Sequence, residues 1–392
     1  MAILTQKLAT VVALEVAKKA GFLKLGSKDY FSSQINGKMK AGQSYDFIIP
    51  DAGNVVSGLV ASPRAIDERK VTLTIENYNN SVQTNALEGI TDLKWEDEVA
   101  EQYAAKLANK VISEKVAEAV CKVNTVFVGE GFMPIANAGA YLQSISTEEI
   151  KGFIDPMAQA VLAANGQHFQ PVGAPDSLYG KGHLGNFQGV EYEAERFLKP
   201  LTVDADFTGV KSGALTTSGP SGDGLYITFM SKPTGTVKKG TPIFVDGYVA
   251  CDTIGDPTSV PFAFIAAEDC DFSAGNLIKV EDVVLDDIGA RQAAWTGLGT
   301  ATAHPDADVK IPEAGTYRLA YIRANGAYNF SEVKELDMKL SDKGAVGDVD
   351  GVRISVNSFT DGINAINTTR WDWCYLAGTI EPRLCTLAMF KM

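Results

Sequence analysis

The first residues in this sequence whose types and spacing could do chemistry are three glycines. Gly180, Gly182 and Gly185 spell G-x-G-x-x-G, the pattern that lets a backbone approach the pyrophosphate of a dinucleotide. That chemistry requires a strand before the glycines and a helix after them. The surrounding segment is rich in turn residues and shows neither pattern. The sequence therefore predicts no dinucleotide site here.

The histidines could ligate a metal or transfer protons, because imidazole titrates near neutral pH. The chain has three, His168, His183 and His304, and no two are spaced as zinc ligands are. Each lies among turn residues, so we interpret each as a loop or surface histidine. The sequence also lacks a Walker A motif, a G-x-S-x-G nucleophile elbow and an H-E-x-x-H zinc motif.

Two acidic clusters could bind calcium or form an acid–base pair. Residues 348–351, DVDG, resemble the start of a calcium loop but lack the third acidic ligand and the closing Glu. We predict a plain turn there, before a strand that begins at Val352. Asp286 and Asp287 are adjacent carboxylates, and with no partner acid to name we interpret them as a solvated edge.

Three aromatic residues, Trp371, Trp373 and Tyr375, could bind a sugar or a peptide. Their alternation also suits a strand that packs one face inward, and we favour that interpretation. The sequence therefore predicts no catalytic, cofactor-binding or metal-binding residue and no cofactor. An enzyme whose site is assembled from loops, around residues 176–195, remains an alternative.

Composition and charge limit the class of protein. At 392 residues the chain exceeds what one core usually supports, so we expect two or three compact units. Its 45% apolar and 21% charged residues are ordinary for a globular protein. The net charge of −13 argues against a surface that grips nucleic acid. No window approaches the roughly 20 apolar residues of a membrane span.

The cysteines and the N-terminal segment both favour a protein that stays in the cytosol. The five cysteines are odd in number and show no C-x-x-C pairing, so we expect reduced, mostly buried thiols: Cys121, Cys251, Cys270, Cys374 and Cys385. Lys7 precedes an apolar run that resembles a signal sequence, but Glu15 and Lys18 interrupt it. We expect an amphipathic helix that ends near Gly21.

The longest periodic pattern, over residues 92–124, predicts a helix on which the other elements are hung. It contains no Gly or Pro, and its apolar residues recur at steps of three and four: Val99, Tyr103, Leu107, Val111, Ile112, Val116, Val120 and Val123. Such a helix is roughly 45 to 50 Å long. Acidic residues crowd its first turns, and Lys115 and Lys122 near its end suit the helix dipole. A long core helix of an α+β enzyme is the alternative.

Two strands flank a segment of about twenty residues before this helix. Residues 45–49 read as a strand ended by Pro50, and residues 70–75 alternate between apolar and polar side chains. Together they predict a long hairpin that leaves the body of the protein. An isolated hairpin is marginal in water, so we expect it to lean on something else, such as another subunit.

After the helix, residues 125–128 read as a strand. Ser146 and Glu149 form a capping-box pattern that predicts a helix, bent or restarted at Asp155-Pro156 and ending near residue 166. Residues 191–198 suggest a helical turn. From about Gly209 short alternating segments follow one another, separated by turn residues, which indicates a small all-β barrel or sandwich.

Strand patterns return after this β-rich segment, at residues 317–323 and 352–356. The apolar run at 384–390 predicts a terminal strand that is paired in a sheet. The fold class is therefore α+β.

This order of elements resembles the major capsid (coat) proteins of tailed bacteriophages, the HK97-like fold, and looks closest to the short-tailed-phage branch with an inserted β-barrel. Four stretches suggest the family: EQYAAKLANKVISEKVAEAV at 101–120, TGTVKKGTPIFVDGY at 234–248, VLDDIGARQAAW at 284–295 and IEPRLCTLAMFK at 380–391. The resemblance covers nearly the whole chain, and its specificity lies in the order of these stretches.

The resemblance implies a division of the chain into the parts of an HK97-like subunit. An N-terminal arm spans 1–43, an extended loop hairpin 44–76, and a peripheral domain with the spine helix 77–145. The first part of the axial domain is 146–208, the inserted β-barrel domain is 209–312, and return strands occupy 313–392. Some family members cross-link a loop lysine to a neighbouring asparagine; Lys70 is present here, but no local motif supports that chemistry.

The resemblance also implies a function without enzymatic activity. The chain would assemble with itself into hexamers and pentamers of an icosahedral head that encloses double-stranded DNA without reading its sequence. A scaffolding protein, a portal and a decoration protein would be partners, and no membrane would be. The subunit would assemble in the bacterial cytoplasm, mature from a procapsid and reside in the virion. The alternative is a β-rich, adhesin-like surface protein whose insert binds glycans through exposed aromatic residues.

Overall fold

The computed structural model describes residues 2–30, 42–50, 68–85, 93–166, 185–219, 222–273, 275–285, 291–296, 306–333, 344–361 and 366–391. The chain forms two compact units. Unit 1 comprises Met1–Phe47, Lys70–Val116 and Asn329–Gly378, and unit 2 comprises Ile48–Arg69, Ala117–Tyr328 and Thr379–Met392. The mixture of helices and sheets confirms the α+β class.

Unit 1 is built on a six-stranded sheet whose central strand is β25 (Ile366–Thr379). Strands β24 and β4 pair with opposite edges of β25, and β22 is its third neighbour. The register pairs Trp373 with Ile354 of β24 and with Tyr78 of β4. The other members are β1 (Ser27–Lys28), β22 (Tyr328–Glu332), β24 (Val352–Asp361), β23 (Ala345–Val349) and β4 (Glu76–Asn85).

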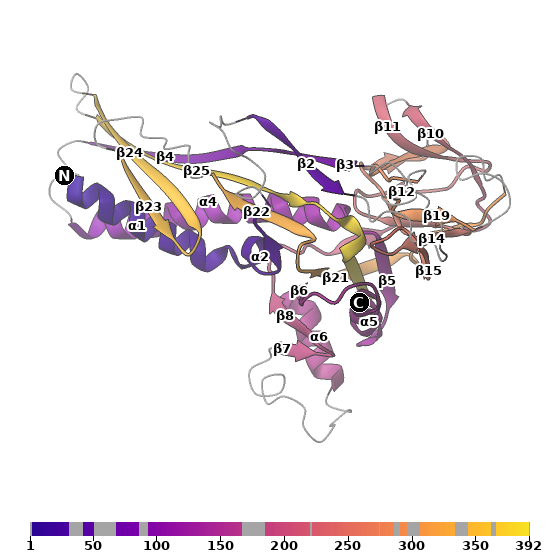
Figure 1. The fold of residues 1–392 in the computed structure, drawn as a ribbon. Coiled ribbons are helices and arrows are strands. Elements are labelled where there is room, and N and C mark those ends of the chain that lie inside the picture. Colours follow the sequence, from indigo (N-terminus) through magenta and orange to yellow (C-terminus); the bar gives the residue numbers. More distant parts are fainter. Residues whose placement is uncertain are drawn as a thin grey trace, which may run out of the picture. The chain divides into compact units, whose positions relative to one another are not determined.

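The first helix, α1 (Ala2–Lys19), packs against β23 and β24 (Figure 1). Its buried face consists of small and branched residues: Ala9, Val12, Ala13 and Val16. Gly347 of β23 makes the close approach possible, because a Cβ there would lie 2.2 Å from the Ala9 carbonyl oxygen. A short helix, α2 (Gly21–Lys24), follows and buries Phe22 and Leu23.

The predicted spine helix is present as α4 (Leu93–Cys121), 29 residues long. Its predicted stripe is buried at Leu107, Val111, Ile112 and Val116. Three alanines of the same helix, Ala104, Ala108 and Ala119, are buried as well. The helix ends a little earlier than expected, because Lys122 N–H donates to the Ala119 carbonyl and Asn124 N–H donates across to Cys385 of another strand.

Unit 2 contains a seven-stranded sheet in the order β5-β26-β21-β6-β8-β7, with β9 also paired to β21. The predicted terminal strand is β26, which pairs with β21 and β5 and so lies inside the sheet. Two pairings, β5 with β26 and β6 with β8, are parallel. The bounds are β5 (Thr125–Gly129), β26 (Cys385–Lys391), β21 (Gly315–Ala324), β6 (Ile150–Ile154), β8 (Val190–Ala194), β7 (Gly185–Phe187) and β9 (Leu201–Val203).

The prediction of a helix that begins at Ser146 was wrong. Helix α5 (Met133–Ile145) ends there, and residues 150–154 form β6 instead. Ile150, Phe153 and Ile154 are buried between β21 and β8, so long-range strand pairing overrides the local capping pattern. Helix α6 (Pro156–Gly166) does start at the predicted proline, and the Asp155 carboxylate accepts a hydrogen bond from Met157 N–H.

The helical turn predicted at 191–198 is also wrong in its first half. Residues 190–194 are strand β8, parallel to β6, with Val190 and Tyr192 fully buried. Gly152 of β6 leaves room for the Tyr192 ring, since a Cβ there would lie 2.3 Å from it.

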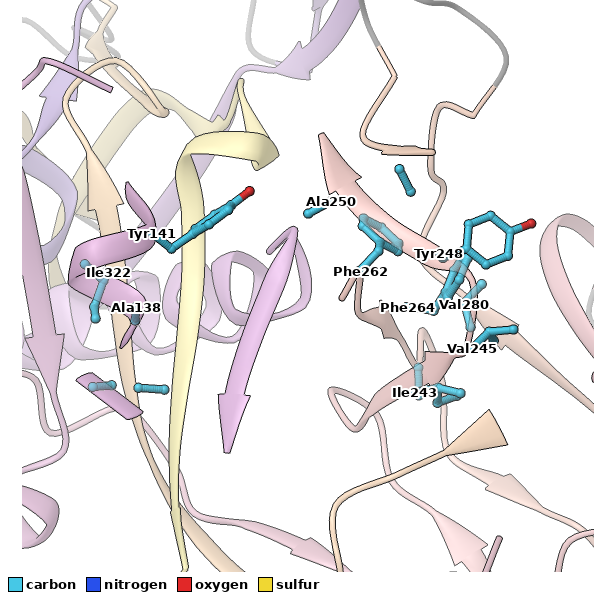
Figure 2. Packing of buried hydrophobic residues seen from close by; sticks show 14 of the residues in the cluster. Ala138, Tyr141, Ile243, Val245, Tyr248, Ala250, Phe262, Phe264, Val280 and Ile322 are labelled. Carbon is cyan, nitrogen blue, oxygen red and sulfur yellow. The ribbon is translucent and has the colours of Figure 1, made fainter. Parts of the chain in front are cut away.

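Residues 209–312, which we call the β-module, contain only strands among their described residues. Its strands form four small antiparallel sheets: β10 (Ser212–Gly219), β11 (Gly222–Phe229) and β18 (Leu277–Val280); β12 (Thr236–Val237) and β17 (Cys270–Asp271); β16 (Phe264–Ile265), β13 (Pro242–Val245) and β20 (Val309–Lys310); β15 (Pro257–Pro261), β14 (Tyr248–Cys251) and β19 (Ala293–Trp295). Aromatic rings meet edge to face in its core, as at Phe262 and Phe264 (Figure 2).

Candidate functional site

The structure tests only some of the residues that could have done chemistry. All three histidines, Gly180, Gly182 and the acidic pair 286–287 lie outside the described residues. Gly185 begins the short strand β7 with a φ of 61°. Within the described ranges, no group of three or more His, Cys, Asp or Glu side chains is arranged to hold a metal ion.

The acidic cluster at 348–351 forms a hairpin turn between β23 and β24. Asp350 has a φ of 50° and Gly351 a φ of 75°, while Val349 and Val352 pair on either side. Two central residues with positive φ are typical of a type I′ hairpin. The structure therefore confirms a plain turn before the strand that begins at Val352.

The aromatic cluster of β25 is buried in unit 1. Trp371, Trp373 and Tyr375 are each at most 2% exposed. Trp371 stacks on Tyr103 of α4 with ring centroids 5.4 Å apart. The Tyr375 hydroxyl donates to Glu76 Oε2 at 2.9 Å. These rings form the core between sheet and helix, which confirms the inward-facing strand and rules out these three as an exposed ligand platform.

Glu332, a half-buried residue whose carboxyl group is buried, is one of the acids that sequence reasoning missed. Trp373 Nε1 donates to its Oε1 at 2.9 Å, whereas its Oε2 is buried with no hydrogen-bond partner among the described residues. Burial raises the pKa of Glu332 to about 8, with Asp348 adding to the effect and the Trp373 and Arg353 donors opposing it. No short-range motif predicts the burial of this carboxyl group, because the residues around it come from β23, β24 and β25.

We expect Glu332 to make the protein less stable as the pH rises. Its folded pKa lies above its unfolded value, so the folded state holds an extra proton between about pH 4.5 and 8. The free energy of unfolding should fall across this window by at most about 1.4 kcal/mol per pH unit from this group. Glu332→Gln should remove that slope in urea titrations between pH 5 and 8.

A control for the pH dependence is Glu148→Gln, at an exposed position in the loop before β6. The free energy of unfolding of Glu148→Gln should depend on pH with the same slope as that of the wild-type protein. Equal slopes for wild type and Glu332→Gln would contradict a neutral buried Glu332.

The cysteines are free, and all but the half-buried Cys270 are buried, as the composition indicated. Burial raises the pKa of Cys121 to about 11 and that of Cys385 to about 12. These thiols are therefore protonated at neutral pH and are poor nucleophiles. The sulfur of Cys385 instead lies 3.1 Å from the Tyr321 hydroxyl, which donates to it.

A hollow beside α6 is lined mostly by apolar side chains. Ala158, Val161, Leu162 and Phe390 contribute, together with Glu130, Gly131 and Lys391. The Lys391 ammonium forms an ion pair with Glu313. These lining residues include no nucleophile with an adjacent base, which nucleophilic catalysis requires.

The two strands predicted to form a hairpin are paired as β2 (Ser44–Pro50) and β3 (Glu68–Thr74). Their polar faces are joined by Thr72 Oγ1, which donates to Asp46 Oδ1 at 2.7 Å. The apolar face is buried at its root in unit 1 by Phe47 and Leu73, and Gly378 of β25 makes room for Leu73. In the part of the chain that the structure describes, this ribbon has no third strand.

Helix α4 is fixed to the sheet of unit 1 by polar contacts as well as by its apolar stripe. Lys115 Nζ lies 2.7 Å from Glu76 Oε1, and the lysine is 4% exposed. One residue earlier, Glu114 accepts a hydrogen bond from the Tyr78 hydroxyl. The root of the ribbon, through Leu73, and the spine helix, through Tyr103, therefore both pack against β25.

No protein-family model matches the chain, and no curated protein matches it.

Among the described helices, none is long and apolar enough to cross a membrane.

Several solved structures are similar to this chain over most of its length. A chain from Mycobacterium phage Che8 has a TM-score of 0.47 and 9% identity, covering 93% of this chain and 89% of its own. A chain from the mature capsid of bacteriophage PhiM1 has a TM-score of 0.44 and 7% identity, with 94% and 86% covered. A virus-like particle from Pyrococcus furiosus gives 0.42 and 10%, with 98% of each chain covered. Over more than nine tenths of its length, this chain is similar to chains from these phage and virus-like-particle structures.

Proposed function

We propose that this chain is the major capsid protein of a tailed bacteriophage, a subunit without enzymatic activity that assembles with copies of itself into a closed shell. The observation that carries the proposal is the β2–β3 ribbon. Its root is firmly packed through Phe47 and Leu73, yet its two strands pair only with each other among the described residues. A lone two-stranded ribbon is marginal in water, so a neighbouring copy is the natural source of further support.

The order of elements supports the same proposal. A ribbon, a long helix packed on a sheet, a second mixed sheet, a β-module and a return to both sheets follow one another along the chain. This is the order that the resemblance to HK97-like capsid proteins implied. We carry over its division into arm (1–43), extended loop (44–76), peripheral (77–145), axial (146–208), inserted β-barrel (209–312) and return segments (313–392) as part of the proposal.

The proposed shell consists of hexamers and pentamers arranged with icosahedral symmetry around double-stranded DNA. A net charge of −13 suits a lining that does not hold DNA tightly, since phosphate binding depends on clustered basic side chains. Assembly in the bacterial cytoplasm with a scaffolding protein and a portal, maturation from a procapsid, and a decoration protein on the outside belong to the same proposal.

Shortening the ribbon should abolish assembly while leaving the subunit folded. In this variant residues 48–69 are replaced by Asn-Gly, a dipeptide that favours a two-residue hairpin turn. We expect wild-type protein, alone or with its scaffold, to form particles or sheets in negative-stain micrographs and to sediment far faster than a monomer. The shortened variant should sediment as a small species with an unchanged circular dichroism spectrum.

A matched control shortens a different hairpin in the same way. Replacing residues 219–222, which include the paired ends of β10 and β11, with Asn-Gly alters the β-module and leaves the ribbon intact. This control should still assemble. Dispersed monomers of the wild type under all conditions, or normal particles from the shortened ribbon, would contradict the proposal.

The adhesin-like alternative required exposed aromatic residues on the insert. The aromatic residues of the β-module are all described, and each is buried or half-buried: Tyr226, Phe229, Phe244, Tyr248, Phe262, Phe264, Phe272 and Trp295. Glycan recognition by stacking needs an accessible ring face, so no observation favours this alternative.

A further inference from the structure

The β-module and the seven-stranded sheet both belong to unit 2, and the chain connects them at one place. The chain leaves the sheet after β9 and returns at the start of β21, where Val203 pairs with Gly315. Between these points the two crossings run side by side, since Val309 N–H donates to the Val210 carbonyl at 3.1 Å. Two adjacent crossings of this kind leave a module free to swing unless something else holds it.

A second set of contacts is made by residues remote in sequence from both crossings. Asn124, which follows α4, is fully buried and uses three polar groups. Its N–H donates to the Cys385 carbonyl of β26, its carbonyl accepts from Ala263 N–H, and its side-chain Nδ2 donates to the Gln292 carbonyl at 3.1 Å. One side chain and its own backbone therefore join the sheet to two separate segments of the module.

Arg383 makes a second connection from the segment that precedes β26. Arg383 is 4% exposed, and its guanidinium is held in place by Glu381, to which Nε and Nη2 donate at 2.8 and 2.9 Å. The remaining Nη1 donates to the Asp252 carbonyl of the module at 3.2 Å. A guanidinium that is fixed by a bidentate carboxylate is a rigid donor, which suits it to holding a backbone carbonyl in place.

The surroundings of these contacts are closed to solvent. Cys251 and Gln292 of the module are buried, and Tyr141 of α5 points toward Ala250 and Phe262 (Figure 2). Burial raises the pKa of Tyr141 far above its usual value, and the side chain of Asn124 and the charges of Asp252 and Arg383 act on it as well. Hydrogen bonds in such a dry setting are stronger than at a surface.

We propose that Asn124 and Arg383 form a clamp that holds the β-module in a single orientation on the seven-stranded sheet. The clamp adds polar attachments, away from the two chain crossings, to the apolar core that residues of the sheet and of the module share. With these attachments the module cannot rotate as an independent body. This proposal concerns the chain by itself and does not depend on assembly.

The test compares Asn124→Leu and Arg383→Met, singly and together, with wild type in the full-length chain. Leucine branches at Cγ as asparagine does but cannot donate a hydrogen bond, and the Gln292 carbonyl keeps its second donor, Cys251 N–H at 3.0 Å. The fold should therefore survive. Dyes attached through unnatural amino acids at the exposed positions Glu148 and Asp223 report the distance between sheet and module.

We expect one narrow distance distribution for wild type and a broadened or split distribution for the double variant. Amide exchange at Ala263 should accelerate at least tenfold, while exchange at Phe229, inside the module, should not change. The matched control is Asn329→Leu, because Asn329 is also fully buried and its Nδ2 donates to the Leu376 carbonyl at 3.0 Å within unit 1.

The control should lower stability without altering the measured distances. A distance distribution and an Ala263 exchange rate that remain those of wild type in the folded double variant would overturn the clamp. If the double variant does not fold, the two single variants decide the question by the same two readouts.

Discussion

Gly347→Ala should be among the most damaging single-methyl additions in this protein. The new Cβ would lie 2.2 Å from the Ala9 carbonyl oxygen and 2.7 Å from Thr10 N, both in the backbone of α1. Backbone atoms cannot rotate away as a side chain can, so the whole helix must shift from β23 and lose contacts along its buried face. Overpacking of this kind typically costs about 3 kcal/mol.

The measurement is urea unfolding of the variant followed by circular dichroism. Gly351→Ala, four residues along in the same hairpin, is the matched control: its φ is 75° and no atom lies within 4 Å of the added Cβ. Backbone strain alone should cost it about 1 to 2 kcal/mol. A loss for Gly347→Ala no larger than this would show that α1 does not need the close approach. Ala9→Gly should not rescue the variant, because the clash is with a carbonyl.

Glu76→Ala should destabilise unit 1 by about 3 kcal/mol, because it removes the carboxylate that pairs with a buried ammonium. Lys115 is 4% exposed and its Nζ lies 2.7 Å from Glu76 Oε1. The same substitution also removes the acceptor of the Tyr375 hydroxyl. This carboxylate of β4 therefore contacts both α4, through Lys115, and β25, through Tyr375.

A double-mutant cycle separates the ion pair from the packing around it. Lys115→Met combined with Glu76→Gln should be less harmful than the sum of the two single changes, since no unpaired charge remains. The control on the same helix is Lys110→Ala, which breaks the exposed pair with Glu114 at 2.6 Å. An exposed pair contributes at most about 1 kcal/mol. Additive effects at Glu76 and Lys115 would mean that the pair is not coupled in the folded protein.

The sequence correctly predicted that Lys115 lies on the helix, but it did not predict the interaction that Lys115 makes. From the sequence, a lysine near a helix end complements the dipole. In the fold it is a buried partner of Glu76, 39 residues earlier in the chain. Nothing local marks that pairing, because it exists only once β4 lies across α4. Glu332 is a similar case, since its pKa is set by neighbours from β23, β24 and β25.

The sequence by itself determined the features that depend on near neighbours. The three- and four-residue period produced α4, the alternation at 70–75 produced β3, Pro156 started α6, and Asp350-Gly351 turned the β23–β24 hairpin. Each of these rests on backbone geometry and on burial of one face, which a window of a few residues already specifies.

Only the tertiary structure decided which segments became partners. Residues 150–154 carry a helix-start signal before them, yet they form β6 because β21 and β8 offer hydrogen bonds on both sides. In the same way Asn124 and Gln292, 168 residues apart, meet at the clamp. The free energy of such contacts comes from groups that are distant in sequence and desolvated together, so no local pattern can record it.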